Sequence, residues 1–146
     1  MSEIIDCPLC KPENEDIIFT NELFRIIHVE DKFYPGYFRL ILNRHVAEMT
    51  DIDEEDACKV LSALLIIERH IREILNPYKV NLASLGNMVP HLHWHIIPRY
   101  KNDRHFPNPI WGKITNPKYS VPDHLIVSEK KLINFLNKKQ NFFQKI

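Results

Sequence analysis

The segment from His91 to Ile97 constrains the fold of this chain more than any other. It has the sequence His-Leu-His-Trp-His-Ile-Ile and is followed by Pro98. Alternate side chains of a β-strand point to the same face, so an extended backbone places three imidazoles on one face and three apolar side chains on the other. A helix would scatter the rings around its axis, and Pro98 opposes one. We therefore predict a strand over about residues 91–100, with its apolar face covered by a helix.

The covering helix is expected directly after Thr50. Asp53 follows three residues later, which resembles a capping box with a shorter acid, and the acidic residues 54–56 favour a first helical turn. Asn76-Pro77 ends the pattern. The pattern predicts a helix of roughly 23 residues, about 35 Å long. Its apolar residues recur with a period near 3.6, at Ala57, Val60, Leu61, Leu64, Ile67, Ile71, Ile74 and Leu75.

Two runs of β-forming residues precede this helix, at Phe24–Val29 and Tyr37–Leu42. The segment between them ends in Pro35-Gly36, so we predict a hairpin. A further strand is expected over residues 79–85. The proline-containing segment 101–123 is expected to be an irregular arm. After it, Ser128 is predicted to cap a short helix that runs to about Asn137.

The charge balance and the few glycines exclude several classes of function. Nineteen basic and nineteen acidic residues give a net charge of zero, so the chain lacks an overall basic field for nucleic acid. Gly36, Gly86 and Gly112 are too far apart for a dinucleotide fingerprint or a P-loop. There is no apolar run of about 18 residues, and the acidic start does not resemble a signal peptide. We therefore expect a cytoplasmic protein with neither a nucleic-acid nor a membrane partner.

The row of histidines indicates catalysis at phosphorus. Imidazole is neutral, nucleophilic and able to donate a proton near pH 7. One ring can attack phosphorus while a neighbouring ring donates hydrogen bonds to phosphate oxygens or to the leaving group. Two other interpretations stay open. Strand histidines two residues apart also ligate zinc, and histidines can be ordinary core or surface residues.

The motif His-φ-His-φ-His-φ-φ at residues 91–97, where φ is an apolar residue, resembles that of the histidine triad (HIT) family. The resemblance covers roughly residues 5–100, including the Pro35-Gly36 turn and the segment 81–87. It implies an α+β, HIT-like fold, in which an antiparallel sheet of about five strands packs against a long helix and shorter helices. We expect a single domain over residues 1–146: a core at about 5–100, then an irregular arm and a short C-terminal helix over 101–146.

The resemblance implies a nucleotide hydrolase or transferase that acts at the α-phosphorus, and commonly a homodimer. His93, the middle histidine, would attack phosphorus and become a nucleotidyl-histidine, which water then hydrolyses. His95 would contact phosphate and assist the leaving group. Candidate substrates are dinucleoside polyphosphates such as diadenosine tetraphosphate (Ap4A), and nucleoside phosphoramidates. The alternatives are a non-catalytic nucleotide-binding module and a zinc-dependent hydrolase with its metal on the triad.

Four further residues are candidates for substrate binding. The resemblance implies that Asn81 places an amide against the phosphates or the leaving group, and that Asn87 holds a place more often given to glutamine. It also implies an acid for the ribose hydroxyls, with Glu30 as the candidate and Asp31 next. Arg99 alternates onto the histidine face, where it can meet a phosphate oxygen. Their structural alternatives are turn asparagines, solvated acids and an ion-paired arginine.

The N-terminal Cys7-Pro8-Leu9-Cys10 has the spacing of two zinc ligands. The three cysteines contain no second such pair, so a tetrahedral site needs histidines from elsewhere, and two reduced cysteines without metal are the alternative. One branch of the HIT superfamily, which includes galactose-1-phosphate uridylyltransferase, resembles this arrangement. It implies a closed structural zinc site, while the histidine chemistry requires no metal. Cys58 is expected to be a small core residue. The implied zinc ligands are Cys7, Cys10, His45 and His91.

Overall fold

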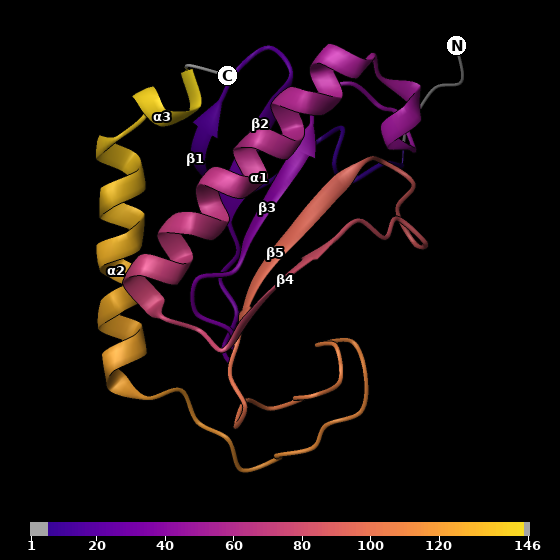
Figure 1. Cartoon of the computed structure of the whole chain (residues 1–146). Helices are drawn as coiled ribbons and strands as arrows, with labels where there is room; N and C mark the ends of the chain where they lie inside the picture. The colour runs from indigo at the N-terminus through magenta and orange to yellow at the C-terminus, as the bar shows by residue number, and fades with distance from the viewer. Residues whose placement is uncertain (1–5, 145–146) are drawn as a thin grey trace.

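Five antiparallel strands form one open sheet in the order β1-β2-β3-β5-β4. The computed structural model describes residues 6–144. The strands are β1 Asp16–Thr20, β2 Phe24–His28, β3 Phe38–Leu42, β4 Lys79–Ala83 and β5 His93–Arg99. The helices are the 3-10 helix η1 Met49–Asp51, α1 Glu54–Leu75, α2 Asp123–Lys138 and α3 Asn141–Gln144. Figure 1 shows α1 lying across one face of the sheet with α2 beside it. Within the described residues, no helix combines the length and apolarity needed to span a bilayer.

The predicted hairpin is confirmed, and the structure adds a strand before it. β2 and β3 pair in antiparallel register, with Phe24 opposite Leu42 and His28 opposite Phe38. β1 pairs with β2 at the edge of the sheet, and its register shifts between Ile17 and Phe19. This irregularity breaks the alternation of buried and exposed residues by which a strand is detected in a sequence.

The long helix is confirmed, but its cap is Asp53 alone. The Asp53 side chain accepts a hydrogen bond from the backbone N–H of Asp56 at 2.8 Å. Thr50, predicted to take part in the cap, lies in η1 instead. Asn76, at a φ of 48°, ends the helix in the left-handed conformation. Cys58 is exposed rather than part of the core, so that expectation was wrong.

The core lies between the sheet and the helices. The helix stripe is buried against alternate residues of the strands, which include Phe24, Phe38, Leu40 and Ile96. As predicted, the apolar side chains of the histidine strand belong to this core: Leu92 and Ile96 are buried within it, and the half-buried Trp94 packs against it. The opposite face of β5 therefore carries His93 and His95 away from α1.

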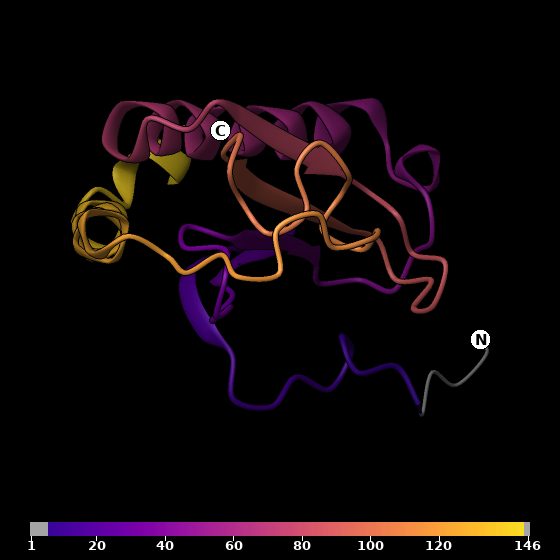
Figure 2. The same ribbon diagram turned by 90° about the horizontal axis from the view of Figure 1, so that it is seen from below.

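The chain beyond β5 forms an arm without helix or strand over residues 100–122, as predicted. The helix after it is longer than predicted, because it begins at Asp123 instead of Ser128. Proline fits the position before a helix, where its missing N–H costs no hydrogen bond, and Pro122 is the residue that precedes α2. In Figure 2, α1 covers the upper face of the sheet and the N-terminal segment lies below it. The strand face opposite α1, which carries His93 and His95, positions the candidate site.

Candidate active site

His93 has one ring nitrogen fixed by a hydrogen bond and the other without a partner in the described part of the chain. Its Nδ1 lies 2.6 Å from the backbone carbonyl oxygen of His91. A carbonyl oxygen can only accept, so Nδ1 carries the proton and Nε2 keeps its lone pair. The residue is 9% exposed. The sheet thus holds His93 in the tautomer that a nucleophile needs.

His95 stands beside His93 and is anchored by a tyrosine. The two ring centroids are 4.9 Å apart, and the hydroxyl of Tyr37 lies 2.5 Å from Nδ1 of His95. Arg39 can only donate to this hydroxyl, so the hydroxyl's own proton is directed to Nδ1 of His95. Nε2 of the neutral ring then carries the proton. His95 therefore offers a hydrogen-bond donor next to the lone pair of His93.

Burial, and after it the positive charge of Arg39 and the neighbouring His93, lowers the pKa of His95 to about 4. The ring is consequently neutral at physiological pH. Tyr37 keeps its proton over the same range, because burial raises the pKa of its hydroxyl. The pair thus has a fixed protonation state under ordinary conditions.

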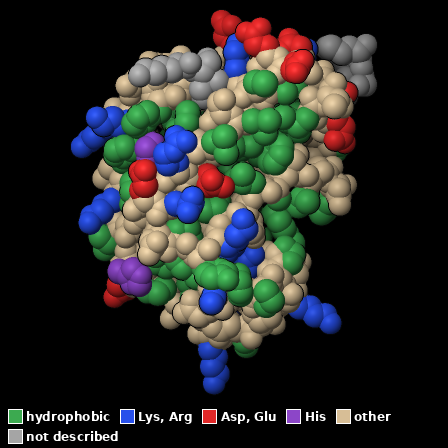
Figure 3. Space-filling model, viewed as in Figure 1, with side chains coloured by type: hydrophobic (Ala, Val, Ile, Leu, Met, Phe, Trp, Pro, Cys, Tyr) green, Lys and Arg blue, Asp and Glu red, His purple; other side chains and the backbone are tan. Residues whose placement is uncertain are grey.

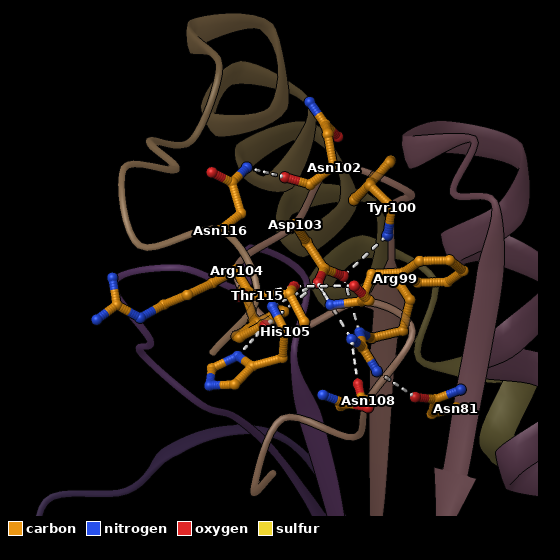
Figure 4. Close-up of polar contacts among 12 residues, drawn as sticks. Asn81, Arg99, Tyr100, Asn102, Asp103, Arg104, His105, Asn108, Thr115 and Asn116 are labelled. Atoms are coloured by element: carbon orange, nitrogen blue, oxygen red, sulfur yellow. Dashed lines mark hydrogen bonds and ion pairs between the residues drawn. The ribbon is translucent and has the colours of Figure 1, made fainter. Parts of the chain in front are cut away.

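Arg99 and Asp103 form a buried ion pair at the start of the arm. Arg99 Nε lies 2.8 Å from Asp103 Oδ2, and Nη2 lies 3.1 Å from Oδ1. The two residues are 2% and 1% exposed. The same carboxylate accepts hydrogen bonds from the backbone N–H groups of Tyr100, His105 and Phe106. Figure 4 shows Asp103 between Arg99, Tyr100 and His105. The arm is thereby fixed to the end of β5.

The guanidinium of Arg99 also donates to two partners besides Asp103. Nη2 donates to the carbonyl oxygen of Asn108 at 2.7 Å, and Nη1 donates to Oδ1 of Asn81 at 2.8 Å. The sequence left open a phosphate contact or an exposed ion pair for Arg99, and the structure shows an ion pair that is internal and buried. The reason is Asp103, four residues later, which the irregular arm folds back onto the guanidinium. Because Asn81 accepts through its oxygen, its amide N–H groups remain for another partner.

The arm also brings an indole to the histidine row. The Trp111 ring lies 4.9 Å from the His95 ring, at an interplanar angle of 74°, and the residue is half exposed. Pro109 and Trp111 line a cavity of about 520 Å³ along β4, together with Asn81 and Ala83. His95 therefore has Tyr37 at its Nδ1 and Trp111 against its ring.

The three remaining predicted substrate contacts, Glu30, Asp31 and Asn87, lie in loops between the strands. Glu30 is exposed and lines a second cavity of about 870 Å³, beyond β3 and β2. Asp31 accepts a hydrogen bond from the backbone N–H of Phe33 at 2.8 Å, within its own loop. Asn87 is exposed in the loop between β4 and β5. Of the predicted polar contacts, the structure thus joins Asn81 to Arg99 and places Glu30 at the second cavity.

Cys7, Cys10, His45 and His91 form a cluster whose ligand atoms all lie within 4.8 Å of one another. His91 Nδ1 lies 3.4 Å from each sulfur and 3.1 Å from Nδ1 of His45. A tetrahedral zinc site separates its sulfur and nitrogen ligands by roughly 3.3–3.8 Å. The four residues therefore fit a metal ion. His93 and His95 stand outside this cluster.

The protonation of His91 agrees with metal ligation. Its Nε2 lies 2.6 Å from the carbonyl oxygen of Leu42, which can only accept, so Nε2 carries the proton. The lone pair is then on Nδ1, which faces the cluster. A backbone carbonyl in this position orients a ligating histidine and raises its basicity when a metal is bound. His91 precedes β5 in the chain, and its imidazole serves the cluster instead of the His93–His95 row.

The sequence interpretation missed two residues of the site, Tyr37 and Arg39. Arg39 lies on β3, and the antiparallel register places it opposite His95. Tyr37 precedes the first β3 residue by one position and reaches His95 through its hydroxyl. The alternation of residues 37–42 marks their shared face, but only the β3–β5 pairing shows which histidine they meet.

Comparison with known proteins identifies the family. A family model described as the HIT domain matches residues 11–102. The AP-4-A phosphorylase of Mycobacterium tuberculosis is 24% identical over 92 residues, which cover 59% of this chain and 47% of that protein. The bis(5'-adenosyl)-triphosphatase of Saccharomyces cerevisiae is 33% identical over 73 residues, which cover 46% of this chain and 35% of that protein. The matches thus span less than half the length of these two relatives.

The fold agrees with the same family. The crystal structure of the histidine triad protein blr8122 from Bradyrhizobium japonicum matches with a TM-score of 0.67 and 29% sequence identity, and the match covers 85% of this chain and 90% of that one. Together with the HIT-domain match over residues 11–102, this shows that the chain belongs to the HIT family. The predicted fold, a five-stranded antiparallel sheet with helices, is confirmed.

Proposed function

We propose that this chain is a nucleotide hydrolase or transferase that acts at the α-phosphorus through a covalent intermediate on His93. The observation that carries the proposal is the hydrogen bond from His93 Nδ1 to the carbonyl oxygen of His91 at 2.6 Å, which leaves the Nε2 lone pair available. A row of histidines without this bond would support binding equally well. A fixed tautomer with the unprotonated nitrogen outward supports nucleophilic attack.

In the proposed first step, the lone pair of His93 Nε2 forms a bond to the α-phosphorus, and the bond from phosphorus to the leaving group breaks. The leaving group takes the bonding electron pair and is stabilised by the Nε2–H group of His95. In the second step, the oxygen of a water molecule attacks the same phosphorus and the phosphorus–nitrogen bond breaks. The nucleoside monophosphate leaves, and the proton lost by water passes to solvent. His93 then regains its lone pair.

Dinucleoside polyphosphates are the substrates that we propose first, with nucleoside phosphoramidates second. The names of the two curated relatives support this order, since one is an AP-4-A phosphorylase and the other a bis(5'-adenosyl)-triphosphatase. The site itself supports either class, because the histidine row requires only a phosphorus centre and a leaving group. The amide N–H groups of Asn81, which its contact with Arg99 leaves available, would contact the phosphate chain.

We also propose that the cluster of Cys7, Cys10, His45 and His91 holds a structural zinc ion. Two sulfur and two nitrogen donors at these separations form a closed set with no position for substrate. Bound there, the ion would supply structural support by tying the N-terminal segment to the loop before β5. The chemistry at His93 would proceed without it, because His93 and His95 lie outside the cluster.

A homodimer is the assembly that we propose. α1 and the loop after β4 carry exposed hydrophobic side chains, at Leu61, Leu65, Leu85 and Met88. Figure 3 shows hydrophobic side chains gathered on the face that carries α1 and the β4 edge. β4 is an edge strand of the sheet, and such an edge can pair with a second chain. Sedimentation at several protein concentrations would test this, and a monomer at every concentration would refute it.

Mass spectrometry of the intact protein tests the catalytic proposal. After brief incubation with Ap4A, the protein is expected to carry one adenylyl group, located on His93. His93→Ala should form no adduct and give no product. His124→Ala is the matched control, because His124 is exposed on α2, and it should behave like the unmodified chain. Hydrolysis by His93→Ala at the original rate would refute the proposal, whereas saturable binding without product would favour a nucleotide-binding module.

A further inference from the structure

Three arginines lie on the strand face that carries the histidine row, and one of them differs from the other two. Arg25 on β2 pairs with Glu15 at 2.6 Å, and Arg99 on β5 pairs with Asp103 at 2.8 Å. Arg39 on β3 lies between these strands, yet it forms none of the ion pairs found within residues 6–144. It is the exception on this face.

The Nε atom of Arg39 is buried and has no hydrogen-bond partner within residues 6–144. Native proteins leave few buried donors unpaired, and each exception calls for a partner that the protein chain does not supply. The guanidinium is held in place from one side, since its central carbon lies 5.5 Å from the centroid of the Tyr37 ring. The side chain is partly buried and held in place, so this cation has the properties of a binding group for an anion.

Arg39 lies between the histidine row and a cavity large enough for a small molecule. Its neighbours across the sheet are His95 on β5 and Ile27 on β2. With Ile27, Val29 and Glu30 it lines the cavity of about 870 Å³. A cavity of this size suits a small-molecule ligand such as a nucleoside. Arg39 thus stands where that cavity meets the histidine row.

None of the acidic residues that line this cavity forms an ion pair with Arg39. Glu15 is paired with Arg25, and Glu129 and Asp16 both face His28, at 3.0 and 3.4 Å. The other acidic side chains of the lining, Glu13 and Glu30, are exposed. The carboxylates of the cavity are therefore either paired with other cations or directed toward solvent.

We propose that Arg39 binds an anionic phosphate oxygen of the nucleotide, at the boundary between the large cavity and the His93–His95 row. The inference rests on the proposed function, because it assumes that the phosphorus attacked by His93 carries a nucleoside. The planar guanidinium can donate two parallel hydrogen bonds to one phosphate. Arg39 would thereby fix the phosphate next to His95, while the nucleoside occupies the cavity lined by Ile27 and Val29.

Isothermal titration of the full chain with 5'-mononucleotides (AMP, GMP, CMP and UMP) and with the matching nucleosides tests this. For the mononucleotide that binds best, Arg39→Met should weaken binding by about tenfold or more. Its affinity for the nucleoside should stay within about twofold, because the nucleoside lacks the phosphate. Arg39→Lys should recover part of the loss, since it restores the charge but not the paired donors. Lys130→Met is the control: it removes an exposed cation from the rim of the same cavity and should change neither affinity.

Unchanged mononucleotide affinity in Arg39→Met would overturn the inference. Equal weakening for nucleoside and mononucleotide would also overturn it, because Arg39 would then shape the cavity rather than bind phosphate. If the unmodified chain bound no mononucleotide, the proposed function and the inference would fail together. If mononucleotides bound normally and only the adduct on His93 were absent, the covalent mechanism alone would fail.

Discussion

The buried ion pair between Arg99 and Asp103 makes a strong prediction about stability. Replacing Asp103 with Asn keeps the size of the side chain but removes its charge. The two carboxylate oxygens accept hydrogen bonds from Arg99 and from three backbone N–H groups. In Asn, an NH2 group, which is a donor, would replace one of these oxygens. The Arg99 guanidinium would then be left buried without a counter-charge. The variant is therefore expected to lose much more stability than an ordinary surface substitution.

The magnitude follows from the burial of both partners. At 2% and 1% exposure, solvent screening is slight, and breaking such a pair costs about 3–5 kcal/mol. Because Asn retains one acceptor, we expect about 3 kcal/mol, or a fall of about 6–12 °C in Tm. Burial alone would raise the pKa of Asp103, but the Arg99 and backbone hydrogen bonds outweigh it and lower the pKa. The stabilisation is thus complete above the unfolded-state pKa of about 3.8 and is lost as the pH falls through the lower folded-state value.

Urea and thermal unfolding at pH 7 measure the effect. Glu55→Gln is the control, because it breaks the exposed Lys59–Glu55 pair of α1 and should cost about 0.5 kcal/mol or less. Adding Arg99→Met to Asp103→Asn should recover part of the loss, since it removes the stranded charge. If Asp103→Asn unfolded at the same temperature as the control, the assigned role of the ion pair would be wrong. A double variant less stable than Asp103→Asn would show that the buried charge is not the cause.

Three further predictions concern the anchor of His95, the metal cluster and the attachment of α2. Tyr37→Phe removes the hydroxyl on His95 Nδ1, and we expect kcat to fall about 10- to 100-fold with a smaller change in KM, as measured by steady-state kinetics. If zinc is bound, a chelator should lower Tm, and Cys10→Ser should abolish that response; an equal response in both proteins would contradict the zinc proposal. Burial disfavours the charged form of His28, but the Glu129 and Asp16 carboxylates outweigh it and raise its pKa. The resulting stabilisation is complete below an unfolded-state pKa of about 6.5 and is lost as the pH rises through the higher folded-state value. Because Glu129→Gln removes the nearer carboxylate, it should flatten the dependence of Tm on pH between about 6 and 8.

The parts of the fold that the sequence predicts are those set by local pattern. The hairpin, α1 and the alternation along β5 each follow from the spacing of apolar residues within one segment. β1 escaped prediction because its register shift disturbs that spacing. α2 begins before the predicted Ser128 cap, because its start at Pro122 and Asp123 uses no capping side chain by which a sequence would mark it.

The residues of the site likewise divide into those that the sequence predicts and those that contacts between distant segments determine. The pairing of His93 with His95 follows from alternation within one strand, and the four cysteine and histidine residues of the cluster were expected from the family resemblance. Arg99 was correctly placed on the histidine face, but its partner lies in an arm whose path no periodic pattern describes. Tyr37 and Arg39 were missed because their meeting with His95 depends on the β3–β5 register. The pattern within one segment does not specify which distant segment it will contact.

The hydrogen bond that His93 Nδ1 makes to the His91 carbonyl oxygen has a consequence for which substitutions this site can tolerate. The acceptor is a main-chain atom, and every amino acid has it. A change at position 91 would alter the imidazole at the metal cluster while leaving the same oxygen for His93. The orientation of the nucleophile is thus encoded in the path of the backbone rather than in the side chain of residue 91.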